Sequence, residues 1–78
     1  MNADEISYWD YRVINRDGDY SIYEVFYDEN DTPRACTENP VTFHGVCLFE
    51  LDKALHLALE GLRKPVLQYD DFLKDKKK

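Results

Sequence analysis

The chain has 78 residues, 14% of them aromatic, and a formal net charge of −6 from 16 acidic and 10 basic side chains. This length allows one domain with a single hydrophobic core. The negative charge disfavours contact with nucleic-acid phosphates and anionic membranes, and no apolar stretch is long enough to span a membrane.

The first seven residues are polar and form an N-terminal segment ahead of the expected domain, which covers residues 8–67. Asp4 and Glu5 stand where a secretory signal would carry basic residues, which disfavours export. We therefore expect a cytoplasmic protein. In that compartment the two cysteines, Cys36 and Cys47, are expected to be reduced thiols.

Asp17-Gly18 is the strongest local signal in the chain. Both residue types tolerate the positive φ angles of a two-residue type I′ turn, and aromatic-rich runs that alternate apolar and polar residues flank them. The pattern predicts a hairpin with strands at residues 8–15 and 20–27. The turn also fixes the register, since a slip of one residue would place Asp10 opposite Glu24.

The predicted register sorts the hairpin side chains onto two faces. One face carries Trp9, Tyr11, Val13, Ile22, Glu24 and Phe26. The other face carries Tyr8, Asp10, Arg12, Ile14, Ser21, Tyr23, Val25 and Tyr27.

Residues 34–38 predict a short third strand. Pro33 before it is compatible with an edge strand and not with a central one. The sequence therefore predicts a three-stranded antiparallel meander with the second strand in the middle. Residues 65–67 add a short fourth extended segment, and residues 68–78 are expected to form an acidic and then lysine-rich tail.

One amphipathic helix is expected over residues 48–63, where apolar residues recur at helical spacing. Its stripe consists of Leu48, Leu51, Leu55, Ala58, Leu59 and Leu62. Cys47 stands at the capping position and is a poor N-cap, while Pro65 ends the helix. Packing this stripe on the Trp9 face of the sheet gives an α+β domain of two layers, with the order β-β-β-α.

That arrangement leaves the second face of the sheet uncovered. Its candidate interaction surface consists of Tyr8, Arg12, Tyr23, Val25 and Tyr27. Tyrosine and arginine are enriched where protein interfaces bind tightly. The sequence thus predicts a small non-catalytic protein-interaction module that binds another protein or forms a homodimer, with no cofactor, catalytic residue or metal ligand assigned.

Two alternatives stay open. Cys36, His44 and Cys47 are residue types that bind zinc or act as nucleophiles, so a small thiol-dependent or metal-dependent protein is the first alternative. The second is nucleic-acid binding through the four lysines among residues 74–78.

Several short motifs are spread over residues 9–67. They are Trp9-x-Tyr11-Arg12-Val13, Tyr20-x-Ile22-x-Glu24-Val25-x-Tyr27-Asp28-Glu29, Pro33, Thr37-Glu38-Asn39-Pro40-Val41, Gly45, Glu50-Leu51 and Lys64-Pro65-Val66-Leu67. As a set they resemble an uncharacterised group of short bacterial proteins, which implies a bacterial origin and a shared β-β-β-α fold but no activity.

The order of elements is also similar in plan to that of HicB-type antitoxins, which implies an antitoxin-like role by analogy of architecture alone. The chain departs from that family between sheet and helix. There Asn39-Pro40-Val41 and His44-Gly45 replace the family's Pro-Gly-Cys segment. The residues after the expected helix do not resemble a DNA-binding segment.

Overall fold

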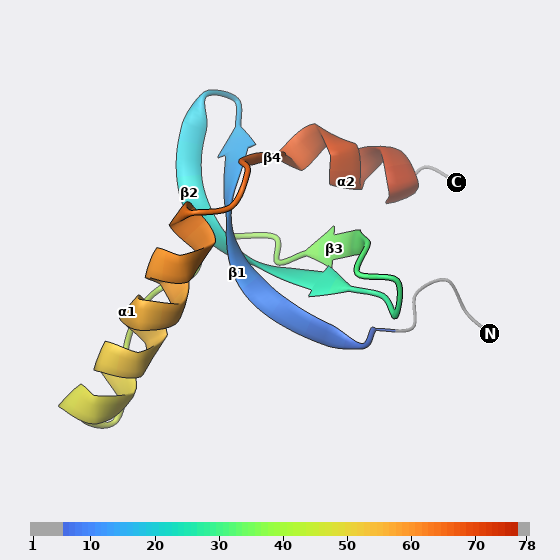
Figure 1. The fold of residues 1–78 in the computed structure, drawn as a ribbon. Helices are drawn as coiled ribbons and strands as arrows, with labels where there is room; N and C mark the ends of the chain where they lie inside the picture. The colour runs from blue at the N-terminus through green and yellow to red at the C-terminus, as the bar shows by residue number, and fades with distance from the viewer. Residues whose placement is uncertain (1–5, 77–78) are drawn as a thin grey trace.

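The computed structural model of the chain describes residues 6–76, and the side chains of residues 6–73. The elements follow in the order β1 (Tyr8–Arg16), β2 (Asp19–Tyr27), β3 (Pro33–Cys36), α1 (Leu48–Leu62), β4 (Leu67–Gln68) and α2 (Tyr69–Lys76). The sheet order is β3-β2-β1-β4 (Figure 1). The first three strands form the predicted antiparallel meander, while β4 pairs with β1 in parallel, so the sheet is mixed.

The β1–β2 hairpin has the predicted turn and register. Asp17 and Gly18 both have positive φ angles, 55° and 87°, as a type I′ turn requires. Trp9 lies opposite Phe26, and each further pair follows along the strands to the turn. The local Asp-Gly signal therefore determined the pairing of the two longest strands.

Helix α2 occupies residues that the sequence led us to expect as a tail. Its side chains Tyr69 and Phe72 are 8% and 6% exposed and belong to the main hydrophobic core. The other buried members of that core are Ile14, Tyr23, Val25 and Tyr27. The guanidinium of Arg16 also lies 4.1 Å from the centre of the Tyr69 ring. The domain therefore extends beyond residue 67, and only residues 77–78 of the expected tail lie outside the described residues.

The N-terminal segment is described from Ile6 onward. The backbone N–H of Ser7 donates to the carbonyl of Tyr27 at 2.9 Å, which extends the pairing of β1 and β2 by one residue. Residues 1–5 of the expected polar segment lie outside the described residues.

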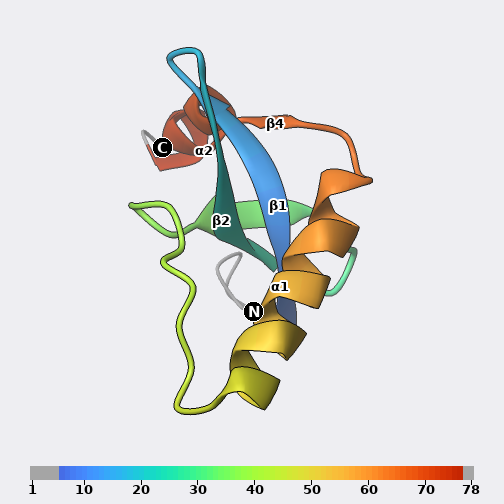
Figure 2. The same cartoon turned by 90° about the vertical axis from the view of Figure 1, so that its left-hand side faces the viewer.

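The two helices lie on opposite sides of the curled sheet, as Figures 1 and 2 show together. Helix α2 covers the face that carries Ile14, Tyr23 and Val25. Helix α1 stands on the other side, mainly against β1. The predicted two-layer arrangement with one covered face is therefore wrong, because the second helix covers the face expected to be open.

Helix α1 contacts β1 through its smallest residues. Ala58 and Gly61 are the buried residues of this helix. A Cβ atom on Gly61 would overlap the carbonyl of Tyr11, so only glycine allows the two backbones to approach this closely. The predicted helix is confirmed in its span, but most of its leucine stripe does not pack on the sheet. Within residues 6–76, neither helix is long and apolar enough to cross a membrane.

Candidate interaction surface

Four of the five residues predicted to form the interaction surface are buried. Tyr23 is 1% exposed, Val25 0%, Tyr27 5% and Arg12 8%. Only Tyr8, at 44%, reaches solvent to a large extent. The prediction of an open sheet face is corrected by α2, which supplies the apolar side chains that cover it.

Arg12 is a structural residue within this covered face. Its Nη1 donates to the hydroxyl of Tyr27 and its Nη2 to the carbonyl of Pro65, both at 2.8 Å. The guanidinium thereby joins β1, β2 and the segment between α1 and β4. Its Nε atom is buried with no hydrogen-bond partner. This donor set is used to hold the fold together and is not presented to a partner.

Tyr8 is likewise tied into the molecule. Its ring stacks on that of Tyr27 with centroids 4.7 Å apart, and its hydroxyl donates to Oδ1 of Asp31 at 2.8 Å. The hydrogen bond to Asp31 is the main cause that raises the pKa of Tyr8 to about 12. Tyr8 therefore braces the turn after β2 against the hairpin.

Exposed apolar side chains are concentrated elsewhere, on α1 and the residue that precedes its N-cap. Of the thirteen large hydrophobic side chains that are exposed in the described part of the chain, seven lie between residues 46 and 62. They are Val46, Leu48, Phe49, Leu55, Leu57, Leu59 and Leu62. This concentration makes α1 the candidate interaction surface.

Five leucines of α1 form one continuous row, which we call the leucine ridge: Leu48, Leu51, Leu55, Leu59 and Leu62. Their spacing of three or four residues places them within one face of the helix. Leu48 is 84% exposed and Leu62 59%, whereas Leu51 is half-buried. The ridge lies beside the small-residue face that contacts β1 rather than on it.

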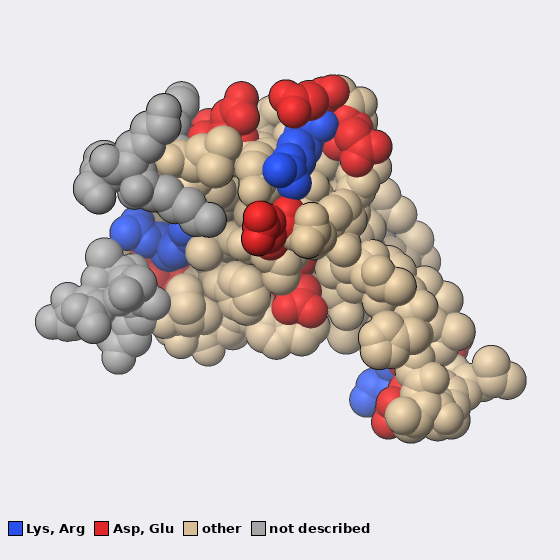
Figure 3. All heavy atoms as spheres, turned by 180° about the vertical axis from the view of Figure 1, so that it is seen from behind, with Lys and Arg blue, Asp and Glu red and all other residues tan. Residues whose placement is uncertain are grey.

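Helix α1 projects from the body of the molecule. In Figure 3 it forms the extension at lower right, whose surface is largely uncharged. Cys47 has an extended backbone and makes no side-chain cap, and the backbone N–H of Val46 meets the carboxylate of Glu50 only at 3.4 Å. The N-terminal turns of this helix therefore have neither a good cap nor a buried apolar face.

The C-terminal end of α1 is anchored more firmly. Lys64 forms an ion pair with Asp10 on β1, and the carbonyl of Pro65 accepts the hydrogen bond from Arg12. The sheet thus holds one end of the helix and leaves the leucine ridge accessible.

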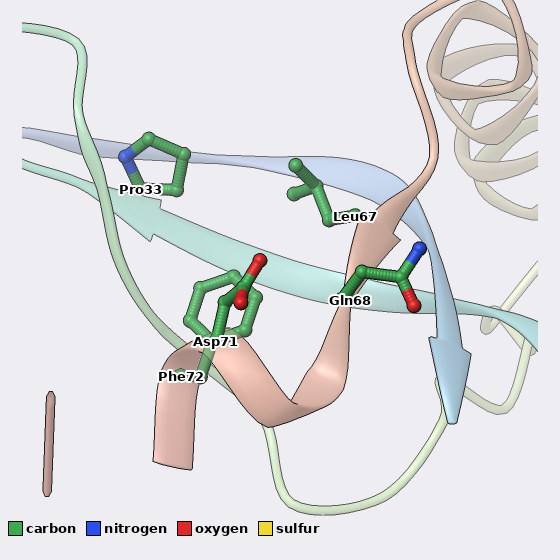
Figure 4. A pocket seen from close by; sticks show the side chains of 5 residues that line it. All are labelled: Pro33, Leu67, Gln68, Asp71 and Phe72. Carbon is green, nitrogen blue, oxygen red and sulfur yellow. The ribbon is translucent and has the colours of Figure 1, made fainter. Parts of the chain in front are cut away.

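A small hollow of about 230 Å³ lies between β3, β4 and α2. Its lining residues are Pro33, Leu67, Gln68, Asp71 and Phe72, and Figure 4 shows Asp71 and Phe72 pointing from α2 toward the strands. Pockets that enclose small molecules have volumes of about 300–1,000 Å³. The hollow is below that range, and its wall includes Phe72 of the hydrophobic core.

Cys36 lies on a different segment from the other two residues of the thiol or metal alternative. Cys36 ends β3 and is half-buried, while Cys47 and His44 are exposed near the start of α1. His56 faces back along the same helix, with Nδ1 2.9 Å from the carbonyl of Asp52. No group of three or more His, Cys, Asp or Glu side chains suited to a metal ion occurs among the described residues.

No known family model, curated protein or solved structure matches this chain. The resemblances to short bacterial proteins and to HicB-type antitoxins stay predictions from the sequence.

The leucine ridge was visible in the sequence as a helical stripe, but its exposure was not. The distribution of small residues is the sequence signal that distinguishes an exposed leucine stripe from a buried one. Ala54, Ala58 and Gly61 form a second face beside the leucines, and small residues allow the closest contact with a neighbouring strand. The small-residue face packs on β1, and the leucine face beside it stays largely exposed.

Proposed function

We propose that this protein is a small non-catalytic protein-interaction module and that its binding surface is the leucine ridge of α1. The observation that supports this proposal is a row of exposed leucines. Leu48, Leu55, Leu59 and Leu62 have exposed fractions of 84%, 47%, 48% and 59%. Single exposed leucines are ordinary on protein surfaces, whereas a contiguous apolar row is typical of a binding surface.

The thermodynamics of helices supports the proposal. Isolated helices of up to about 15 residues are only marginally stable in water, and most helical stability in proteins comes from packing of an apolar face. Helix α1 has 15 residues, and its poorly capped N-terminal turns carry Leu48 and Phe49 in solvent. A partner that covers the ridge would supply the packing that these turns lack.

Photo-crosslinking tests the proposal. We expect benzoylphenylalanine in place of Leu59 to form protein adducts in the cells that produce the chain, whether with a second copy or with another protein. The matched control is the same substitution at Tyr20, which is 64% exposed at the end of the hairpin. Equal adduct formation at the two positions, or none at position 59, would contradict the proposal.

A further inference from the structure

The leucine ridge fits a second copy of the same chain. We infer that two molecules associate through their α1 helices, which run antiparallel about a two-fold axis at Leu55. This inference rests on the proposed function and names its partner. It differs from the dimer expected from the sequence, since that surface was a sheet face now covered by α2.

The order of leucines along α1 carries the inference. Relative to Leu55, leucines stand seven and four residues before it and four and seven residues after it. The pattern is therefore the same when read in either direction along the helix. In an antiparallel pair centred on Leu55, Leu48 meets Leu62 of the other copy and Leu51 meets Leu59. Such a self-complementary surface is what a two-fold interface requires.

The packing of α1 on its own sheet leaves room for this arrangement. At about 100° per residue, the centre of the ridge lies roughly 90° around the helix from the face formed by Ala54, Ala58 and Gly61. A second helix at the usual distance of about 8–10 Å would therefore lie beside β1 and not in its place. The buried residues Ala58 and Gly61 belong to the C-terminal half of α1.

Antiparallel pairing therefore places the two sheets at opposite ends of the helix pair. The projecting N-terminal half of each helix would lie next to the C-terminal half of the other, which is anchored to its own sheet. The exposed Leu48 would thereby gain a neighbour held in place by the other copy's fold.

The charge distribution favours a second copy over a strongly basic partner. Residues 46–64 contain three acidic side chains, at positions 50, 52 and 60, and three basic ones, at positions 53, 63 and 64. This segment is therefore neutral, and the net charge of −6 belongs to the rest of the chain. A basic partner would be attracted to those other surfaces, whereas the neutral helix allows close approach of two acidic molecules.

Two charged side chains also match across the proposed axis. Asp52 and Arg63 lie along the same edge of the ridge on either side of Leu55, since both are rotated in the same direction from it. Antiparallel pairing puts Asp52 of each copy and Arg63 of the other on the same side of the helix pair, about 7.5 Å apart along it, a gap that the long Arg63 side chain can span. In the single chain Arg63 has only a loose contact with Glu60 at 3.9 Å, and both side chains are about two-thirds exposed.

Sedimentation equilibrium of the full-length protein tests the inference. We expect a dimer with a dissociation constant in roughly the micromolar range or tighter. Leu55→Asp should weaken it at least about a hundredfold, because each dimer would bury two carboxylates at the axis in place of two leucines. Leu55 is 47% exposed in the single chain, so circular dichroism should show an unchanged fold.

Leu57→Asp is the matched control. Leu57 lies on the same helix and is equally exposed, at 49%, but it is outside the ridge. We expect this variant to remain dimeric. If Leu57→Asp and Leu55→Asp weakened the dimer equally, association would depend on the apolar surface of the helix as a whole and not on the ridge. The inference would then be wrong.

Disulfide trapping in a background with Cys36→Ser and Cys47→Ser tests the orientation. Leu55→Cys should form a disulfide-linked dimer, since the axis passes through this position. Leu48→Cys alone should not, but a mixture with Leu62→Cys should. Dimers linked through Leu48→Cys alone would indicate parallel helices and overturn the antiparallel arrangement.

These outcomes separate the inference from the proposed function. A wild-type protein that stays monomeric at about 100 µM overturns the inference, because that concentration lies far above a micromolar dissociation constant. If position 59 nevertheless crosslinks to a different protein in cells, the ridge is a binding surface for another partner and the proposed function stands. If neither self-association nor a crosslink is found, both are wrong.

Discussion

Arg12 carries a positive charge inside the protein, and it stabilises the fold through the hydrogen bonds that it donates. Its two hydrogen bonds reach Tyr27 and the carbonyl of Pro65, and it is 8% exposed. Arg12→Ala would leave both acceptors without a donor and a cavity between them. We expect a loss of about 2–4 kcal/mol in the free energy of unfolding, measured by urea denaturation.

Arg34→Ala is the control for Arg12. The Arg34 side chain is 34% exposed and lies 3.8 Å from a carboxylate oxygen of Asp28. A surface ion pair of this kind contributes about 0–1 kcal/mol. Equal losses for the two variants would show that Arg12 is not the internal strut that its contacts indicate.

Tyr8 gives the domain a dependence on alkaline pH. Its hydrogen bond to Asp31 is the first cause that raises the pKa of the phenol from 10.0 to about 12. Below the unfolded value the phenol is protonated in both states and the bond contributes its full stability. Between pH 10 and about 12 the unfolded chain loses this proton first, so the free energy of unfolding falls.

Asp31→Asn checks this assignment, because it removes the negative charge that disfavours the phenolate. We expect the ring resonances of Tyr8, followed by NMR against pH, to titrate at a lower pH in the variant than in the wild type. An unchanged midpoint would mean that Asp31 does not hold the Tyr8 proton.

Helix α2 shows how a short element decides which face of a sheet is buried. Phe72 is 6% exposed among the core residues, whereas its neighbour Leu73 is 38% exposed. Phe72→Ala should cost about 3–4 kcal/mol of unfolding free energy, a large part of the roughly 4–12 kcal/mol expected for a chain of this length. Leu73→Ala should cost less than about 1 kcal/mol. If urea denaturation showed equal and small losses of unfolding free energy for the two variants, residues 69–76 would be a tail that does not pack on the sheet.

The features that the sequence predicts correctly are those controlled by local interactions. Asp17 and Gly18 determine the hairpin register through their own backbone angles, and the leucine spacing determines the extent of α1. The face covered by a helix is not a local property. A register defines two faces of a sheet and leaves open which one is covered.

The missed helix illustrates the same limit. Five of the eight residues of α2 are charged, so its apolar pattern is short. Two weaker signals were present. Tyr69 and Phe72 are three residues apart, which places them on one helical face, and Asp70 and Asp71 suit the positive end of a helix dipole. These two signals predict a helix only when the sheet against which Tyr69 and Phe72 pack is known.

At the scale of the whole molecule, association must overcome the repulsion between two acidic bodies. Two charges of −6 with centres about 30 Å apart repel by about 5 kcal/mol in salt-free water. At about 0.15 M salt the screening length is about 8 Å, so most of this repulsion is removed. The two proposed Asp52–Arg63 contacts lose at most about 1 kcal/mol each under the same change. The general repulsion is therefore the larger effect.

We accordingly expect salt to strengthen the dimer. The dissociation constant from sedimentation equilibrium should fall by at least about tenfold as ionic strength rises from about 0.01 M to 0.15 M. Leu57→Asp adds one negative charge per copy outside the ridge, so its dimer should respond to salt more steeply than the wild type. A dissociation constant that rises with salt would mean that attraction between specific charges dominates. The neutral, leucine-based contact between two α1 helices would then be the wrong description of how two copies meet.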